Sequence, residues 1–355
     1  MLKKIKLFCV INIVLVLAAS IFACKKASVD EKSVLPTEVV AENMTERKTE
    51  KIKIVATIFP IYDIVRELVP EDRCEVTLLL DSGIDIHNFQ PTAKDITTIA
   101  DSDLFIYIGG ESDSWVQKVI DTSQNKNLNA VNLMEEISDF VKKEEIVEGM
   151  EHEHEHESEE GHEEGHEEEH EEHEHEAEND EHIWLSLRNI KAITDVIADK
   201  LIELDKDNKE VVLEKAESFQ GKVDDLDKRY KEVVDNASVK TLLFADRFPF
   251  RYLVDDYKLS YFAAFSGCSA EVEASFETVA FLAKKIDELS LRHISALVGS
   301  HHKIPETVKN TTEKKDQDII YFDSMEGITD IEDREEVNYL KIMEKNLNSL
   351  EKALN

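Results

Sequence analysis

The sequence predicts an α/β protein with two lobes, each built on a parallel sheet, joined by a long rigid helix. Strand patterns alternate with helix patterns over residues 51–110 and again over residues 237–355. This alternation is typical of parallel sheets whose faces are covered by helices. Between the two blocks, residues 209–234 are strongly charged but carry apolar side chains at helical spacing, which predicts the linking helix.

The first block opens with residues 52–56, an alternating and β-branched run that predicts a strand. Residues 60–70 repeat apolar side chains at helical spacing, and residues 75–80 form a second strand pattern. A further helix is expected from about Pro91, because proline is favoured in a first helical turn. Residues 104–108 form the third strand pattern, so a parallel sheet is expected here.

The second block repeats the alternation after two helix patterns. Its expected elements, with those that precede it, are strands at 241–244, 257–265, 294–298 and 319–322 and helices at 187–204, 209–234, 276–289 and 335–354. We therefore divide the ordered chain into an N-terminal lobe at 51–204, a linking helix at 205–236 and a C-terminal lobe at 237–355.

Residues 151–180 interrupt the first lobe with a stretch of Glu and His that has almost no apolar side chain. Such a stretch cannot bury enough surface to offset its ordering entropy, so it predicts a disordered loop. Its histidines are His152, His154, His156, His162, His166, His170, His173 and His175. Imidazole suits zinc, copper and nickel, which predicts loose binding of several ions. A merely solubilising acidic loop is the alternative, but it would need no histidine.

The charge of the chain favours a cation as its ligand. The net charge is −35, from 77 acidic and 42 basic residues. Residues 151–181 hold seventeen Glu and one Asp with no Lys or Arg, which accounts for −18 of that total. A strongly acidic protein is repelled by nucleic acid and by anionic membrane surfaces, so we expect no nucleic-acid partner.

The N-terminus has the pattern of an export signal. Lys3, Lys4 and Lys6 precede an apolar stretch at 7–22, which is shorter than the roughly 20 residues of a spanning helix. The run that ends at Cys24 (Ile-Phe-Ala-Cys) resembles the lipobox of bacterial lipoproteins. That resemblance implies a signal peptide at 1–23 and lipidation of Cys24. It also implies a place on the extracytoplasmic face of the cell membrane. The polar composition of the residues that follow predicts a flexible tether at 24–50.

Two cysteines, Cys74 and Cys268, remain once the signal peptide and Cys24 are set aside. Two thiols do not make a disulfide framework. They are expected as free, buried residues, and the sequence leaves open whether they pair.

Two further histidines are candidates for a specific metal site. His87 follows the second predicted strand, at the carboxyl end of the sheet, where open α/β folds bind their ligands. His182 follows the Glu/His stretch and stands next to the apolar anchor Trp184. Each of these histidines taken alone is a weak signal, because a histidine in a loop is more often a surface residue.

Residues 83–95 resemble the segment G-x-D-x-H-x-[FY]-x-P-[ST]-x-x-D, and residues 180–185 resemble D-x-H-x-W-L. Both segments are found in the metal-binding receptors of bacterial zinc and manganese ABC importers, which the chain resembles over about residues 52–355. The resemblance implies His87 and His182 as metal ligands and zinc before manganese as cargo. It also implies an ABC permease with its ATPase as partner, and no catalytic residue.

The C-terminal lobe departs from this family pattern. The family usually has F-H-D-x-F where this chain reads F-A-D-R-F, so Ala245 stands where a histidine ligand is expected. Asp323 matches an aspartate that some members use as a ligand. His301 and His302, directly after a predicted strand, are substitutes for the missing histidine, with His302 favoured. A solvated turn is the alternative there, and Asp246 is a further candidate ligand.

Two other functions are compatible with this composition. A zinc-dependent hydrolase could be built from Asp, Glu and His, but the chain has neither H-E-x-x-H nor G-x-S-x-G. A surface adhesin is the other alternative, since some members of the family are described in that way. The metal receptor remains the leading hypothesis.

Overall fold

The computed structural model describes residues 51–81, 85–150, 178–269, 273–300, 303–328 and 337–355. Residues Thr49–Asn355 form one compact unit. Several predicted features lie outside the described residues, namely the signal peptide, Cys24, the tether, the stretch 151–177, and both His301 and His302. Among the helices that are described, none is long and apolar enough to cross a membrane.

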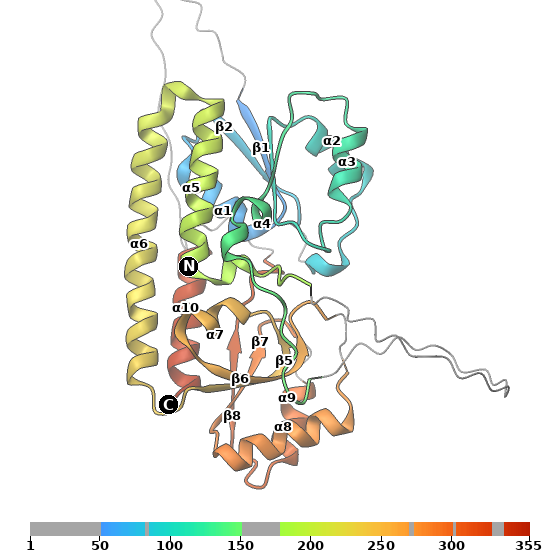
Figure 1. The fold of residues 1–355 in the computed structure, drawn as a ribbon, viewed down its shortest axis with the longest axis vertical. Helices are drawn as coiled ribbons and strands as arrows, with labels where there is room; N and C mark the ends of the chain where they lie inside the picture. The colour runs from blue at the N-terminus through green and yellow to red at the C-terminus, as the bar shows by residue number, and fades with distance from the viewer. Residues whose placement is uncertain (1–50, 82–84, 151–177, 270–272, 301–302, 329–336) are drawn as a thin grey trace, which may run out of the picture. The chain divides into compact units, whose positions relative to one another are not determined.

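The first sheet has four parallel strands in the order β2-β1-β3-β4 (Figure 1). Its strands are β1 (Ile52–Ala56), β2 (Cys74–Leu78), β3 (Leu104–Tyr107) and β4 (Asn129–Asn132). Ile54 of the central strand β1 pairs with Val76 on one side and Leu104 on the other. The predicted parallel sheet is confirmed, and β4 is a strand that the sequence patterns did not indicate.

The second sheet repeats this topology with the order β6-β5-β7-β8, again all parallel. Its strands are β5 (Thr241–Phe248), β6 (Ser260–Ser266), β7 (His293–Leu297) and β8 (Asp318–Phe322). The pairing of β5 with β6 shifts register between Phe244 and Arg247. Ala245 and Asp246 lie in this irregular part, which explains why the strand pattern in the sequence broke off at residue 244.

The helices that accompany the first sheet range from 4 to 18 residues in length. They are α1 (Phe59–Leu68), α2 (Ala93–Ala100), α3 (Val116–Thr122), α4 (Leu133–Glu136) and α5 (Leu187–Leu204). The helix expected from about Pro91 begins at Ala93, because Thr92 and Asp95 form a capping box that fixes its first turn. Short 3-10 turns at Ile86–Asn88 and Ile183–Leu185 carry the segments around the two candidate histidines.

The predicted linking helix is α6 (Lys209–Asn236), with 28 residues, preceded by a 3-10 turn at Lys206–Asn208. It buries one stripe and leaves the rest of its charged surface exposed. The buried stripe consists of Val212, Ala216, Phe219, Val223, Leu226, Tyr230 and Val234. Figure 1 shows α6 beside α5 and α10, and the contacts of α6 with both helices agree.

The helices of the second sheet are α7 (Arg251–Tyr257), α8 (Phe276–Leu289), α9 (Lys303–Thr311) and α10 (Tyr339–Ala353). Helix α8 has the predicted bounds. The strand expected at 257–265 instead begins at Ser260, because α7 occupies the preceding residues and ends at Lys258 in a left-handed conformation (φ 57°). The C-terminal helix begins at Tyr339, where the Asn338 side chain caps it by accepting from the Lys341 N–H.

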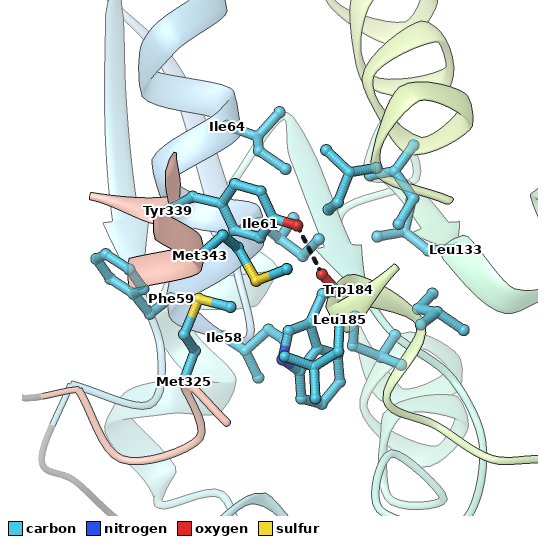
Figure 2. Packing of buried hydrophobic residues seen from close by; sticks show 14 of the residues in the cluster. Ile58, Phe59, Ile61, Ile64, Leu133, Trp184, Leu185, Met325, Tyr339 and Met343 are labelled. Carbon is cyan, nitrogen blue, oxygen red and sulfur yellow. Dashed lines mark hydrogen bonds between the residues drawn. The ribbon is translucent and has the colours of Figure 1, made fainter. Parts of the chain in front are cut away.

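Helix α10 packs between α6, α1 and the second sheet. The hydroxyl of Tyr230 donates to the Met343 carbonyl at 2.6 Å, and the hydroxyl of Tyr339 donates to the Trp184 carbonyl at 2.9 Å. Figure 2 shows Tyr339 and Trp184 within a buried cluster that also holds Phe59 and Met343. The indole Nε1 of Trp184 donates to the Ser324 carbonyl at 2.8 Å. Trp184 therefore anchors the segment that carries His182 against the turn after β8.

Candidate metal centre

His87 lies in the 3-10 turn at Ile86–Asn88, which follows β2. The Asp85 carboxylate accepts the backbone N–H of His87 at 3.0 Å and so fixes this turn. The imidazole is held by a hydrogen bond of 2.8 Å between Nδ1 and the Ser112 hydroxyl oxygen. Its side chain is only 8% exposed. A ring fixed through Nδ1 presents Nε2 for another contact.

His182 is fully buried and sits directly before the turn at Ile183–Leu185. One oxygen of Asp180 lies 3.0 Å from its Nδ1 and also accepts its backbone N–H at 2.9 Å. The His182 ring lies 5.4 Å from the His87 ring, measured between centroids. The two histidines that the sequence singled out are thus brought together, each held through Nδ1.

A buried carboxylate that the sequence analysis missed joins the two rings. Glu326 Oε1 lies 2.9 Å from Nε2 of His182 and 3.4 Å from Nε2 of His87. Its other oxygen accepts the Ser324 hydroxyl at 2.8 Å, and the Arg247 guanidinium lies 3.7 Å from it. The Glu326 side chain is 6% exposed. Two imidazoles and one carboxylate thus meet in the interior of the protein, and together they form a donor set that suits zinc.

One nitrogen of this cluster has no hydrogen-bond partner among the residues that the structure describes. Nε2 of His87 is buried, and its contact of 3.4 Å with Glu326 is too poorly aligned to count as a hydrogen bond. A buried polar atom without a partner is costly unless it serves another purpose. Because Ser112 holds Nδ1, the lone pair of Nε2 is available to a cation when the imidazole is neutral.

The protonation of the cluster is set by its carboxylates. Burial alone would lower the pKa of His182, but the charges and hydrogen bonds of Asp180 and Glu326 outweigh it and raise the pKa to about 10. Burial would raise the pKa of Glu326, but His182 and His87 hold it well below its usual range. Without a metal, His182 therefore carries a proton at neutral pH that a cation must displace.

Asp323, the predicted ligand from this part of the chain, is engaged by neighbouring groups of its own turn and of α10. Its Oδ1 accepts the backbone N–H of Met325 at 2.8 Å, and its own N–H donates to Asn346 at 2.8 Å. In the described part of the chain, the ion-pair partners of the two imidazoles are Asp180, Glu181 and Glu326. Asp323 thus shapes the turn that presents Glu326, three residues further on.

Asp246, the other predicted candidate, is occupied by backbone groups. One of its oxygens accepts the N–H of Arg247 at 2.9 Å, and the other accepts the N–H of Leu297 at 3.1 Å. The carboxylate therefore ties β5 to β7 at the irregularity of the sheet. The Arg247 side chain turns to Asp85 instead, with 2.7 Å between Nη2 and Oδ2.

Cys268 is the second residue that the sequence analysis did not place at the site. It is a free cysteine, and its sulfur and one ring nitrogen each of His87 and His182 all lie within 4.8 Å of one another. Burial and the charge of Glu144 raise the pKa of its thiol. No signal in the sequence indicated this proximity, because Cys268 is 86 residues from His182 along the chain.

A cavity of about 300 Å³ opens beside His87 and Cys268. Its wall carries four carboxylates, those of Glu111, Glu144, Glu178 and Glu181. Partial burial and the neighbouring Glu111 raise the pKa of Glu178. Such a wall attracts cations. The last residues of the predicted disordered stretch also differ from expectation here, since Asn179 pairs with Lys143 and Asp180 is buried.

Residues 54–353 match the family described as zinc-uptake complex component A, periplasmic (ZnuA). The zinc-binding lipoprotein AdcA of Streptococcus pneumoniae strain R6 is 28% identical over 330 residues, which are 93% of this chain and 61% of AdcA. The high-affinity zinc uptake system protein ZnuA of Bacillus subtilis is 28% identical over 309 residues, which are 87% of this chain and 89% of that protein.

Solved structures share the fold. The Zn(II)-bound ZnuA-like domain of AdcA from Streptococcus pneumoniae superposes with a TM-score of 0.63 at 25% identity, covering 86% of this chain and 99% of that domain. The periplasmic zinc binding protein TroA of Treponema pallidum reaches 0.67 at 20% identity, with coverage of 86% and 99%, and shows the fold alone. With a family match over nearly the whole ordered chain, the protein belongs to the zinc-uptake complex component A (ZnuA) family.

Proposed function

We propose that the protein is an extracytoplasmic receptor that binds zinc through His87, His182 and Glu326 and delivers it to an ABC permease driven by its ATPase. The convergence of two buried imidazole Nε2 atoms on one Glu326 oxygen carries this proposal. Relatives named for zinc binding and zinc uptake support the choice of cargo.

The donor set favours zinc over manganese. Imidazole nitrogen suits zinc, whereas manganese prefers sites made of oxygen donors. In this cluster two of the three donors are imidazoles, and both rings are already oriented through Nδ1 by Ser112 and Asp180. Such orienting partners raise metal affinity, because the ligands need not be ordered on binding.

The origin of the donors suits a transport receptor. His87 and His182 come from the part of the chain that surrounds the first sheet, whereas Glu326 follows β8 of the second sheet. An ion bound to all three would tie the two sheets together and give the loaded protein a defined shape. A permease can recognise that shape and disfavour the metal-free one.

Two further features fit the proposal. The acidic cavity beside His87 offers a route by which a cation reaches the buried ligands. We assign the Glu/His stretch at 151–177 the role of a loose collector of zinc, and Cys24 the role of the lipid anchor. No catalytic role is proposed, and assays for esterase and phosphatase activity with added zinc should detect no turnover.

Zinc titration in competition with a chelator tests the proposal. The protein should bind one zinc ion tightly and manganese more weakly, and the double variant His87→Ala/His182→Ala should lack the tight ion. A strain that lacks the gene should also grow poorly under zinc starvation. Tight binding that survives the double variant, or normal growth of that strain, would contradict the receptor function and favour the adhesin alternative.

A further inference from the structure

Three donors leave zinc one ligand short of the four that a closed tetrahedral site has. The strand β5 offers Ala245 at the position where a fourth donor is expected, and both oxygens of the adjacent Asp246 are taken by backbone N–H groups. A fourth donor must therefore come from another element of the chain.

Cys268 lies in the turn after β6, and its sulfur approaches both histidines. The sulfur and one ring nitrogen of each of His87 and His182 all lie within 4.8 Å of one another. In a tetrahedral zinc site with bonds of about 2.1 Å to nitrogen and 2.3 Å to sulfur, neighbouring donor atoms are about 3.4 to 3.6 Å apart. The bound of 4.8 Å is wider than this spacing, so an ion that bound all three donors would draw them together.

The turn that carries Cys268 is built for close approach to the site. A Cβ atom added at Gly267 would lie 2.9 Å from Cε1 of His182 and 3.0 Å from the Phe248 carbonyl oxygen. Any larger residue at this position would therefore push the turn away from the imidazole. On the other side, the Cys268 N–H donates to the Glu144 carboxylate at 3.1 Å, which fixes the turn.

An independent feature points to a ligand at the same place. Nε2 of His87 is buried and finds no hydrogen-bond partner in the described part of the chain, on a side chain that is only 8% exposed. The nearby Glu326 oxygen already engages His182. A buried ring nitrogen without a hydrogen-bond partner beside a carboxylate is a candidate metal donor.

From these observations we infer that Cys268 supplies the fourth ligand, so that zinc is bound by two His, one Cys and one Glu. The inference rests on the proposed receptor function and specifies its ligand set and its metal preference. On binding, the S–H bond of Cys268 breaks, a zinc–sulfur bond forms, and the proton passes to water. Because thiolate is a soft donor that manganese disfavours, this site selects zinc and cobalt over manganese.

Cobalt(II) is the probe that reports a sulfur ligand directly. The full-length protein loaded with one equivalent of cobalt should show an intense near-ultraviolet band from charge transfer between thiolate and cobalt. The band should disappear in Cys268→Ser and persist in Cys74→Ala, which removes the other free thiol in the described chain. The Glu/His stretch contains no cysteine, so cobalt bound there contributes no such band.

The zinc affinity provides the second measurement. Cys268→Ser should weaken tight zinc binding by more than the roughly 10–100-fold that follows loss of a residue that merely orients a ligand. Manganese binding should change much less, so that the ratio of the two affinities falls. Alkylation of the Cys268 thiol by iodoacetamide should also be slowed by bound zinc, and this comparison needs no variant.

The outcomes separate the two proposals. If cobalt gives no thiolate band, and zinc neither protects Cys268 from alkylation nor binds less tightly in Cys268→Ser, the fourth-ligand inference is wrong. The receptor function would still stand if His87→Ala abolished tight binding in the same assay. If His87→Ala also binds zinc tightly, the receptor site itself is misassigned.

Discussion

The two sides of the metal centre are built in different ways. On the side of the first sheet, His87 and His182 each have a dedicated partner that fixes the ring, Ser112 for one and Asp180 for the other. On the side of the second sheet, Glu326 and Cys268 stand on turns that follow β8 and β6. The first side therefore resembles a preformed half-site, and the second supplies donors that depend on the conformation of turns.

The two sides also differ in what balances their charge without a metal. On the first side, a proton on His182 balances the charge of Asp180 and of Glu326, which reaches across from the second side. On the second side, Arg247 lies 3.7 Å from Glu326 and 2.7 Å from Asp85, measured between side-chain N and O atoms. An arriving cation therefore replaces a proton, and it has to share Glu326 with an arginine that remains charged.

The largest loss of zinc affinity is expected when His182, the fully buried histidine of the first side, is replaced. His182→Ala should weaken tight zinc binding by well over the roughly 100-fold upper range for an orienting residue, because a direct ligand is lost. His293→Ala is the matched control, since His293 lies in β7 and is not part of the cluster. Chelator competition measures both variants, and equal affinities would show that His182 is no ligand.

The second prediction tests the turn after β8. Glu326→Gln should weaken zinc binding by at least ~10–100-fold, because a neutral amide is a poor ligand and cannot balance the charge of the ion. Asp323→Asn keeps an oxygen that can accept the Met325 N–H, so its zinc affinity should stay within about threefold of the wild type. The reverse ranking would restore Asp323 as the ligand that the sequence pattern suggested.

The difference between the two sides also explains which site residues could be predicted from the sequence. His87 and His182 stand in ordered local motifs next to a strand end and a buried Trp, and local patterns survive in the sequence. Asp323 and Glu326 are two acids within four residues, and only the backbone contacts of the turn determine which one faces the histidines. Cys268 lies near the histidines because the adjacent Gly267 packs closely against the His182 ring. Such a tertiary contact leaves no periodic pattern in the sequence.

The fold, too, could be predicted only where the sequence carries a repeated local pattern. Repeated apolar patterns predicted both parallel sheets, the linking helix and the bounds of α8. Helix α7 was missed because it is short and directly precedes β6, and the expected strand at 257–265 began on its last residue, Tyr257. The boundary between the two elements lies at Lys258, which has a left-handed backbone (φ 57°). A lysine in a sequence rarely indicates that conformation.

The third prediction concerns the proton that His182 releases when zinc binds. Because the pKa of His182 is raised to about 10, zinc binding near pH 7.5 should release about one proton from this residue. Cys268→Ala isolates that proton from the thiol proton. Calorimetry in buffers with different ionisation enthalpies measures the release. Between pH 7 and 9 the zinc affinity of this variant should rise about tenfold per unit. A flat affinity would contradict a protonated His182.

The stability of the metal-free protein follows the same groups. The raised pKa of His182 gives stability that is complete below its ordinary value of 6.5 and is lost as pH rises toward about 10. The lowered pKa of Glu326 gives stability that is present above its ordinary value of 4.5 and is lost as pH falls. Melting temperatures without metal should therefore be highest between these two values, and bound zinc should extend the plateau to higher pH.

The fourth prediction removes the Glu/His stretch from the comparison. Replacing residues 151–177 with a short Gly/Ser linker should abolish weakly bound zinc ions in a titration and leave the tight one. A matched deletion that extends through Asp180 should weaken the tight ion as well, because Asp180 holds His182. Loss of the tight ion in the shorter deletion would instead make the stretch the principal site.

The smallest effect on zinc binding is expected from hydrogen bonds that connect the two sides but do not contact a ligand. The buried hydroxyl of Tyr339 donates to the Trp184 carbonyl (Figure 2). The Trp184 indole in turn donates to the Ser324 carbonyl, two residues before Glu326. Tyr339→Phe removes one buried hydrogen bond, so the free energy of unfolding should fall by about 1 kcal/mol, up to about 3 if the carbonyl stays unsatisfied. Chemical denaturation measures this change.

Zinc affinity should stay the same in Tyr339→Phe, because the indole contact with Ser324 remains. Tyr252→Phe is the matched control, since the Tyr252 hydroxyl donates to the carbonyl of Asp180, which also holds His182. Tyr252→Phe also loses the hydrogen bond that its hydroxyl accepts from the Lys142 N–H at 3.2 Å. Only Tyr252→Phe loosens a residue that orients a ligand, so only this variant should lower the zinc affinity. A loss of affinity in Tyr339→Phe would show that the packing of α10 helps to position Glu326.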